Sequence, residues 1–587
     1  MATVLLFDRE DASHFPTPRA DSTAFALTPS AAEAARTLGL HLAVHEGNFS
    51  ASGDARCVAA ARRAVRDFDR AVAASGLPTS IIVMARQSVW GHASLVHRLK
   101  LSLPPAPWIV RGCAGDWVEA HDWETLHQAF LPRIWDSGLA HRITASRPPF
   151  PVLFNWLNRL LALAARRRPG PWIASSSHKL KNGLQEGLAD LANLAVIRST
   201  EGNWTDYRAL LSSIRSARSL ETFRLPPLAL SHPKVETALG TLHRIGSEFS
   251  DPRVRSAWRA YAPYLARAVP VMLGIVCGSP ALLRTIGARA AIGYEANSWL
   301  AASLMEAAGH AGIKRVVFNH NSHPLSGSPI ADSVLQTLLR QRTWNELTEV
   351  AAVWSPFSLA ALRDFATSSQ QSRILPVQLK YPTRSEHLVT TRPLRILHAG
   401  NYQNWSDFFP WVAETADEYL HGIETLAATV EKMDGIELVV RVRPKREVDM
   451  PTVERSLGNR RNVTVCSTEQ DFLEQLAESD LLVAHFSTTV EQALQMGKPV
   501  LLWGSTNRYC QYPGQETPPE GRLTGRVYIA RKASALPAML AGIRDALQGE
   551  DAEASPSAYA FEAGTPDVAD LASFLIYPTP INQGLNQ

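Results

Sequence analysis

Short apolar runs alternate with stretches of helical periodicity over the first hundred residues. The runs TVLLFD (3–8) and TSIIVMAR (79–86) are typical of buried strands, and residues 30–47 have the pattern of a helix followed by a strand. Residues 55–76 have the apolar spacing of one long helix. Strands that alternate with helices predict a parallel, doubly wound sheet. We therefore expect the N-terminal third to be an α/β domain.

The pattern is less regular over residues 140–270 and becomes regular again after them. Residues 140–270 are rich in Arg, Leu, Trp and Pro and have mostly helical periodicity, which predicts a helical insertion or a cap over the first sheet. In residues 288–324, a strand that ends near Glu295 leads into a helix, and Gly312 ends that helix before the strand IKRVVFNH. Residues 349–365 predict one more strand and helix.

A polar, proline-rich stretch, residues 366–393, separates two α/β units. The run LRILHAG (394–400) opens the second unit, with a helix over 408–433 and further strands at IELVVRVRP, VTVCS, LLVAHF and PVLLW. We expect an N-terminal α/β domain over 1–385 that includes the 140–270 insertion, a C-terminal α/β domain over 393–548, and a tail over 549–587 with a helix at 567–576.

The composition is that of a globular protein, with 45% hydrophobic and 19% charged residues. The formal net charge is only +4 and Lys and Arg are dispersed, so we expect no nucleic-acid partner. Five cysteines lie far apart, which indicates reduced thiols rather than a disulfide framework or a zinc site. The N-terminus lacks the basic start and long apolar core of a secretion signal. We expect a cytoplasmic protein.

One segment, residues 150–170, combines apolar and basic residues. Asn155, Asn158 and Arg159 interrupt it, and it falls short of the roughly 20 apolar residues that a membrane span needs. An amphipathic helix with a basic end suits an anionic membrane face. A core helix with a solvated charged end has the same pattern. Peripheral contact with the inner membrane is thus one of two expectations for this segment.

The stretch LLVAHFSTTVEQALQMGKPVLLW (481–503) places three hydroxyl residues between a strand and a helix. Ser487, Thr488 and Thr489 lie at the predicted helix N-terminus, where free backbone N–H groups and the helix dipole favour an anion. The alternative is an ordinary helix start, in which Thr488 and Glu491 form a capping box. We expect that capping box, and it is compatible with phosphate binding because a cap leaves further amides free.

The continuation of this stretch resembles the nucleotide-binding signature in the second domain of GT-B glycosyltransferases. In that signature a strand, a Ser/Thr loop and a helix are followed by Gly-x-Pro and another strand. The resemblance implies two Rossmann-type doubly wound domains that face a cleft. It also implies that Ser487 and Thr488 hold the donor phosphate, while Glu491 or its neighbours meet the nucleotide sugar.

Cations cluster at the end of the strand IELVVRVRP. Arg443 and Lys445 are placed to neutralise a donor phosphate, although a basic solvated edge has the same pattern. Relatives with CMP- or CDP-linked donors often carry Arg-Pro-His-Pro here. In this chain Lys445 and Arg446 occupy the His-Pro positions, which leaves the donor nucleotide open.

The second unit begins with the strand–loop junction HAGNYQNW (398–405). His398 and Gly400 are donor-side candidates there, with helix-start geometry as the alternative. The sequence has no Walker A loop, G-x-G-x-x-G, H-E-x-x-H or G-x-S-x-G motif. No D-x-D motif stands at a promising strand end, so we expect no metal, with cations and a helix dipole stabilising the leaving phosphate instead.

On the first-domain side, Glu295 ends one predicted strand and His320 ends the next. In a parallel sheet both then lie at the same edge. A carboxylate and an imidazole that face one cleft suit general acid–base catalysis, or a carboxylate nucleophile with a histidine proton donor. The alternatives are that Glu295 caps the following helix and that His320 is a hydrogen-bonded core histidine.

The motifs YEANSW and FNHNSHP together resemble a family of bacterial surface-carbohydrate biosynthesis proteins. In that family Tyr-Glu-Asn-x-x-Trp precedes a helix and a Gln-His-Ser strand end. The matching residues are Tyr294, Glu295, Asn297 (displaced by one position), Trp299 and His320. The segments GIKRVVFNH, AAVWSPFSLAAL and RILPVQLK are similar in order to those of β-Kdo transferases, bacterial polysialyltransferases and CDP-glycerol glycerophosphotransferases. The resemblance covers residues 288–510.

The resemblance implies a GT-B glycosyltransferase that moves a sugar from a nucleotide-activated donor, such as a CMP-linked ulosonic acid, to a bacterial surface polysaccharide or glycolipid precursor. The expected catalytic residues are Glu295 and His320, and the expected donor-binding residues are Ser487, Thr488, Thr489, Glu491, Arg443, Lys445, His398 and Gly400. No cofactor is expected besides the nucleotide sugar. The alternatives are a CDP-polyol phosphotransferase, a nucleotide-sugar 2-epimerase and a non-catalytic polysaccharide-assembly protein.

Overall fold

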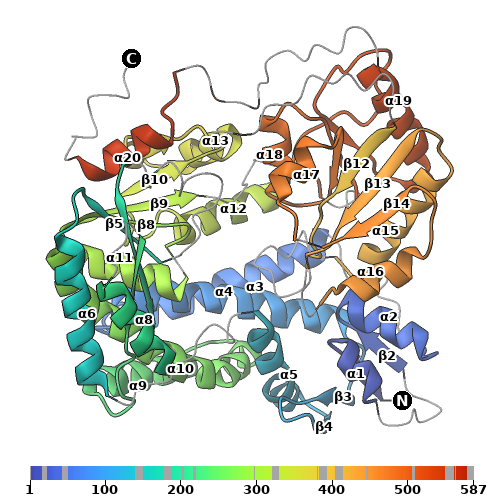
Figure 1. Ribbon diagram of the computed structural model, residues 1–587. Coiled ribbons are helices and arrows are strands. Elements are labelled where there is room, and N and C mark those ends of the chain that lie inside the picture. Colours follow the sequence, from blue (N-terminus) through green and yellow to red (C-terminus); the bar gives the residue numbers. More distant parts are fainter. Residues whose placement is uncertain are drawn as a thin grey trace.

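A computed structural model of the chain contains three β-sheets with helices packed around them (Figure 1). The structure describes residues 2–15, 23–42, 51–138, 150–176, 188, 191–199, 204–215, 220–296, 298–319, 329–379, 381, 393–403, 414–443, 447–467, 469–504, 509–548, 559, 561 and 564–577. The predicted linker over 366–393 is described in part: it contains the helix α14 (Ser368–Gln371) and the strand β11 (Ile374–Pro376), while residues 382–392 lie outside these ranges.

The largest sheet has seven parallel strands in the order β11-β10-β9-β8-β5-β6-β7. The strands are β5 (Trp172–Ser175), β6 (Asn193–Ser199), β7 (Leu220–Leu225), β8 (Ala288–Gly293), β9 (Lys314–Asn319), β10 (Val350–Val353) and β11 (Ile374–Pro376). The order reverses between β5 and β8, and ligands of open parallel sheets bind beyond the carboxyl ends of the strands at such a switch point.

The second large sheet has six parallel strands in the order β14-β13-β12-β15-β16-β17. The strands are β12 (Leu394–His398), β13 (Ile436–Arg441), β14 (Val463–Cys466), β15 (Leu481–Ala484), β16 (Val500–Leu502) and β17 (Val527–Ile529). Its switch point lies between β12 and β15. The two sheets form two separate lobes (Figure 1). The predicted fold class is confirmed in that the chain is α/β and contains two Rossmann-type parallel sheets.

Helices cover both large sheets. Those of the seven-stranded lobe are α6 (Pro151–Arg166), α8 (Trp204–Arg215), α9 (Pro233–Ser247), α10 (Pro252–Ile286), α11 (Trp299–Ala311), α12 (Pro329–Arg342), α13 (Pro356–Phe365) and α14 (Ser368–Gln371). Those of the six-stranded lobe are α15 (Ala416–Glu431), α16 (Met450–Leu457), α17 (Phe472–Ala477), α18 (Thr489–Gln495), the 3₁₀ turn η3 (Ala533–Ala535) and α19 (Leu536–Gln548).

The prediction of a mostly helical insertion over 140–270 is wrong in one respect. The described part of this region contains long helices, but it also supplies β5, β6 and β7 of the seven-stranded sheet. Strand β5 was missed because it has only four residues in a context rich in Trp, Arg and Pro. A short apolar run of this kind cannot be assigned to strand or helix by its period alone.

The predicted strand over 79–86 is also wrong, because these residues begin helix α4 (Thr79–Ser102). Most of α4 is buried, with core residues on every side of the helix. A helix that is buried all round loses its amphipathic period and then resembles a buried strand. Helix α4 packs along α3 (Ala51–Val72) and against α10 and α11.

The first strands of the chain belong to neither large sheet. They form a four-stranded sheet in the order β2-β1-β3-β4, in which only β4 is antiparallel to its neighbour. The strands are β1 (Thr3–Leu6), β2 (Thr23–Ala26), β3 (Trp108–Arg111) and β4 (Trp117–Ala120), accompanied by α1 (Arg9–Ser13), α2 (Pro29–Thr37) and α5 (Trp123–Gly138). The N-terminal third is thus α/β as expected, but its sheet is a separate unit.

This small unit docks on the six-stranded lobe (Figure 1). Helix α2 contacts α15 and α16, and one hydrophobic cluster runs through both units. Glu33 pairs with Arg455 at 2.6 Å and with Arg9 at 2.9 Å, while Arg9 also pairs with Asp449 at 3.1 Å. The N-terminal residues are therefore tied to the C-terminal lobe by both apolar and ionic contacts.

One further helix connects the lobes, and one long helix lies in the core. The predicted helix at 567–576 is α20 (Val568–Ile576), which packs on β5 and β8 of the seven-stranded sheet although it follows the six-stranded lobe in sequence. Helix α10 is the one described helix long and apolar enough to cross a membrane, but 72% of its apolar window is buried inside the protein. It packs against α4, α5, α9 and α11, as a core helix does.

Candidate functional site

His398 and Gly400 lie at the switch point of the six-stranded sheet. His398 is the last residue of β12, and burial lowers the pKa of its imidazole to about 4. Its Nδ1 atom is buried and has no hydrogen-bond partner among the described residues. A Cβ at Gly400 would lie 3.3 Å from His398 Nε2, so the glycine gives the ring its space. The imidazole is neutral at pH 7 and available as a hydrogen-bonding group.

Ser487, Thr488 and Thr489 form the turn between β15 and α18, on the other side of this switch point. Ser487 is held by Gln511, whose Oε1 accepts from Ser487 N at 2.9 Å and whose Nε2 donates to Ser487 O at 3.2 Å. Thr489 Oγ1 donates to Ala399 O at 3.4 Å and so joins the turn to the loop after β12. Within the described residues, the backbone N–H and hydroxyl of Thr488 have no hydrogen-bond partner.

The expected capping box between Thr488 and Glu491 is absent. Thr488 has helical backbone angles and its side chain caps nothing, whereas Ser487 Oγ accepts from Thr489 N at 3.2 Å. Glu491 is 1% exposed, and Tyr512 donates a 2.5 Å hydrogen bond to its Oε1. The carboxylate of Glu491 is therefore bound to Tyr512 and does not cap the helix. Local sequence spacing does not reveal this contact, because Tyr512 lies in a distant segment. The donor-binding role of Glu491 stays a prediction.

Arg443 follows β13 and lines a pocket at the carboxyl edge of the sheet, together with Gly400, Tyr402, Tyr419 and Glu447. It is exposed and forms no ion pair with any acid in the described part of the chain. Lys445 lies outside the described residues.

Arg441, at the end of β13, is engaged elsewhere. It donates to Gln470 O at 2.8 Å, and its guanidinium lies 5.7 Å from the ring centre of Phe472. The strand end therefore presents Arg443 rather than both arginines.

The two lobes meet on the sides where their strands end. Gln495, in α18, donates to the carbonyl of Trp354, which follows β10, at 3.2 Å. The Phe357 ring of α13 packs edge-on against Tyr512 with centres 4.9 Å apart. Phe486, two residues after β15, packs on the hydrophobic cluster of the seven-stranded lobe. The carboxyl edges of both sheets therefore open toward the same interlobe region.

Glu295 lies at the carboxyl edge of the seven-stranded sheet, two residues after β8. Strand β8 borders the switch point, and the side chain of Glu295 is 25% exposed and 3.5 Å from Arg342 Nη1. Glu295 is not the cap of the next helix, because Ser298 caps α11. His320 lies outside the described residues, directly after β9, which pairs with β8 in parallel.

Sequence reasoning missed several residues around the donor-side switch point. His485 follows β15 and is buried, and Gly504 packs so closely on it that a Cβ would lie 2.7 Å from His485 Cβ. Gly504 also has φ +145°, where other residues are strained. A histidine directly after a predicted strand was a usable pattern for His485. Gln511 and Tyr512 had none, because their contacts are made across the fold.

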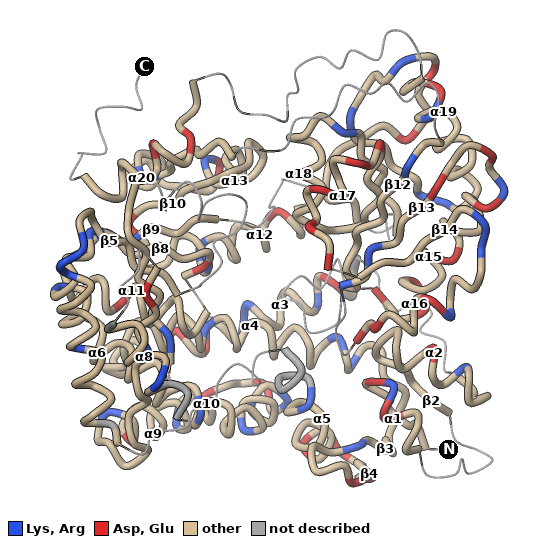
Figure 2. The backbone as a smooth tube through the Cα atoms, in the orientation of Figure 1, with Lys and Arg blue, Asp and Glu red and all other residues tan. Residues whose placement is uncertain are grey.

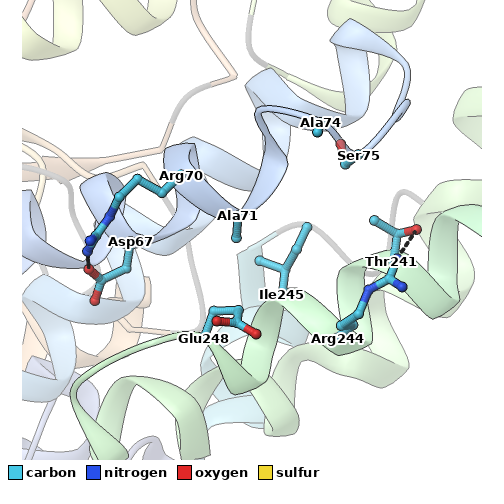
Figure 3. A pocket seen from close by; sticks show the side chains of 9 residues that line it. All are labelled: Asp67, Arg70, Ala71, Ala74, Ser75, Thr241, Arg244, Ile245 and Glu248. Atoms are coloured by element: carbon cyan, nitrogen blue, oxygen red, sulfur yellow. Dashed lines mark hydrogen bonds and ion pairs between the residues drawn. The ribbon is translucent and has the colours of Figure 1, made fainter.

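Other charged features lie away from this region. Lys, Arg, Asp and Glu are interspersed along the backbone of both lobes (Figure 2). A groove between α3 and α9 is lined by Asp67, Arg70, Arg244 and Glu248 among others, but by none of the predicted site residues (Figure 3). Among the described residues, no group of three or more His, Cys, Asp and Glu is arranged to hold a metal ion. Metal independence stays a prediction.

Comparison with known proteins found distant structural neighbours only. No protein-family model matches the chain, and no curated protein matches it. Solved structures similar to it include MurG of Acinetobacter baumannii (10% identity, TM-score 0.34, covering 70% of this chain and 99% of that one). Others are a glycosyltransferase of Rickettsia africae (9%, 0.34, 65% and 92%) and the UDP-GlcNAc 2-epimerase of Neisseria meningitidis bound to UDP-GlcNAc (8%, 0.34, 69% and 97%). Likeness at this level supports no argument about the chemistry of this chain.

Proposed function

We propose that the chain is a glycosyltransferase that takes a sugar from a nucleotide-activated donor and passes it to a surface polysaccharide or glycolipid precursor in the cytoplasm. One observation carries the proposal. The switch point of the six-stranded sheet carries the N–H and hydroxyl of Thr488, without partners in the described chain, and an exposed Arg443 lies at the same sheet edge. Hydrogen-bond donors and a cation at one edge of a sheet suit a diphosphate.

On the donor side, Thr488 and Arg443 bind the phosphate that becomes the leaving group. Lys445, two residues after Arg443, adds a second cation. The neutral imidazole of His398 and the space left by Gly400 shape the pocket next to the phosphate. Because cations and amides offset the charge that develops on the leaving phosphate, the reaction requires no metal.

On the acceptor side, Glu295 and His320 face the reacting carbon. The oxygen of the acceptor hydroxyl attacks the anomeric carbon of the donor sugar. The bond from that carbon to the phosphate oxygen breaks, and the nucleotide leaves with the bonding electrons. Glu295 takes the proton of the acceptor hydroxyl, and Arg342 holds its carboxylate in position. His320 is the second proton-transfer group.

The test is turnover. Purified protein is incubated with CMP-, CDP-, UDP- and GDP-linked sugars and a bacterial lipid extract, and nucleotide release is measured. Glu295→Gln is expected to lower kcat by about 100-fold or more, the usual contribution of a general base. Glu346→Gln, at an exposed acid of the same lobe, is the matched control. Turnover that survives both Glu295→Gln and His320→Asn would exclude the catalytic assignment.

A further inference from the structure

Helix α6 lies at the outer edge of the seven-stranded lobe (Figure 1), and it presents an apolar face to solvent. The exposed side chains at and after its start are Phe150 (54%), Val152 (84%), Leu153 (43%), Trp156 (54%) and Leu163 (50%). At 3.6 residues per turn, the positions from 152 to 163 fall within a sector of about 100° of the helix. They form one continuous stripe rather than scattered surface residues.

The opposite face of α6 is fully occupied by the core. Phe154, Leu157 and Leu161 are buried, and α6 packs against α8, α10 and β7. Asn158 Nδ2 donates to Arg224 O at 2.8 Å, which fixes the rotation of the helix about its axis. The exposed stripe is therefore a second apolar face. A contiguous exposed apolar face, unlike apolar residues scattered singly, marks a binding surface.

Basic side chains border the stripe. Arg159 and Arg166 lie beside it on the helix, Arg167 caps its C-terminal end, and all three are exposed. The helix contains no Asp or Glu. Apolar side chains, a half-exposed Trp and arginines on one exposed face match the boundary of an anionic bilayer, where the ring enters the headgroup layer and the cations meet lipid phosphates.

A second copy of the same face fits less well. It would cover the apolar stripe but would offer the arginines no acid from α6. An anionic lipid surface satisfies both the apolar side chains and the arginines.

We propose that α6 docks the protein on an anionic phospholipid surface through Phe150, Val152, Trp156 and Leu163, with Arg159 and Arg166 at the headgroups. The first turn of α6 begins at Pro151, and residues 167–171 join the other end of the helix to β5. The hydrogen bond from Phe150 N to Tyr207 Oη, 3.0 Å long, ties this turn to α8, which follows the carboxyl end of β6. The docked bilayer then lies beside the edge that carries Glu295.

The docking does not depend on the proposed function. The idea that docking brings a lipid-linked acceptor to Glu295 does rest on the proposed function. Nucleotide binding in solution is therefore measured in parallel, so that failure of one proposal is distinguished from failure of the other.

The experiment is co-sedimentation of the full chain with vesicles of phosphatidylcholine alone and of phosphatidylcholine with about 30% phosphatidylglycerol. The wild type is expected to bind the anionic vesicles and to be released as salt is raised to about 0.5 M, because surface charges are then screened. The double change Val152→Gln and Trp156→Gln is expected to weaken this binding at least tenfold. Leu230→Gln, at an apolar side chain that is 60% exposed outside α6, is the matched control and should bind like the wild type.

A second variant, Arg159→Gln with Arg166→Gln, is expected to abolish the preference for anionic vesicles. Circular dichroism and thermal unfolding check that each variant folds. Absence of vesicle binding by the wild type, equal binding to both vesicle types, or equal binding by the Val152/Trp156 variant would overturn the proposal. Light scattering checks the alternative occupant. A wild type that is dimeric and a Val152/Trp156 variant that is monomeric, with equal vesicle binding by both, would assign the face to a second copy instead.

Discussion

Tyr512 donates a 2.5 Å hydrogen bond to Glu491 Oε1 in the interior of the six-stranded lobe, and both residues are 1% exposed. The bond joins the segment after β16 to α18. The Tyr512 ring also packs on Phe357 of the other lobe. One tyrosine thus positions the helix that follows the predicted phosphate-binding turn and links that helix to the opposite lobe.

Replacing Tyr512 by Phe leaves the buried carboxylate of Glu491 without this donor. We expect Tyr512→Phe to lower the free energy of unfolding by about 2 kcal/mol, the contribution of a hydrogen bond to a charged group. Glu491→Gln is expected to cost less, because the amide oxygen still accepts from the tyrosine. Urea unfolding monitored by circular dichroism measures both values. An unchanged free energy of unfolding in Tyr512→Phe would show that the hydrogen bond contributes nothing to stability.

Glu33 connects the N-terminal unit to the six-stranded lobe. Burial by itself raises the pKa of its carboxyl, but the hydrogen bond from Arg455 and the charge of Arg9 outweigh burial and lower the pKa below its ordinary 4.5. A carboxyl group whose pKa is lowered by folding stabilises the folded state at any pH above its pKa in the unfolded chain. This stabilisation is lost as the pH falls through the pKa of the folded state.

We therefore expect Glu33→Gln to destabilise the protein by about 1 kcal/mol at pH 7, a modest value because the arginines are partly solvated. The difference from the wild type should shrink below pH 4.5. Thermal unfolding at pH 7 and in the acid range measures it, with Glu437→Gln, at the exposed position of β13, as the control variant. A difference that grows on acidification would contradict the ion-pair account.

His398 predicts a second pH effect of the same sign at a higher pH. Its pKa falls from 6.5 to about 4 on burial, so the unfolded chain takes up a proton before the folded chain does. Stability contributed by the neutral imidazole is complete above pH 6.5 and is lost between there and pH 4. His398→Asn should reduce the loss of unfolding free energy between pH 7.5 and pH 5. An unchanged pH dependence would place His398 in a solvated environment.

Local patterns predicted most elements of the two large sheets. Strand β12 and the strand–helix pair at 350–365 were predictable because each has one apolar period and clear boundaries, such as Ser355 as the cap of α13. Gly312 was predicted as the end of α11 and has the positive φ of +71° that this position requires. Helix α4 and strand β5 were not predictable, because burial on all sides removes the period.

For the site, the sequence predicted only which residues lie at the ends of strands. His398 ends a strand that borders a switch point, while Thr488 and Glu295 follow such strands. The alternation of strands and helices in the sequence is enough to place them there. The contacts of Glu491 with Tyr512 and of Ser487 with Gln511 join residues more than twenty positions apart. Such tertiary competition decides whether a side chain caps a helix, packs in the core or faces a ligand, and local spacing does not contain it.

The most direct test of the central claim is calorimetric titration of the nucleotide that gives the largest thermal shift among CMP, CDP, UDP and GDP. Arg443→Gln is expected to weaken binding by about tenfold or more, because it removes a charge-assisted contact to phosphate. Arg461→Gln, at an exposed arginine before β14 on the opposite sheet edge, should bind like the wild type. Absence of any nucleotide binding by the wild type, or equal affinity in Arg443→Gln, would contradict a donor site at this sheet edge.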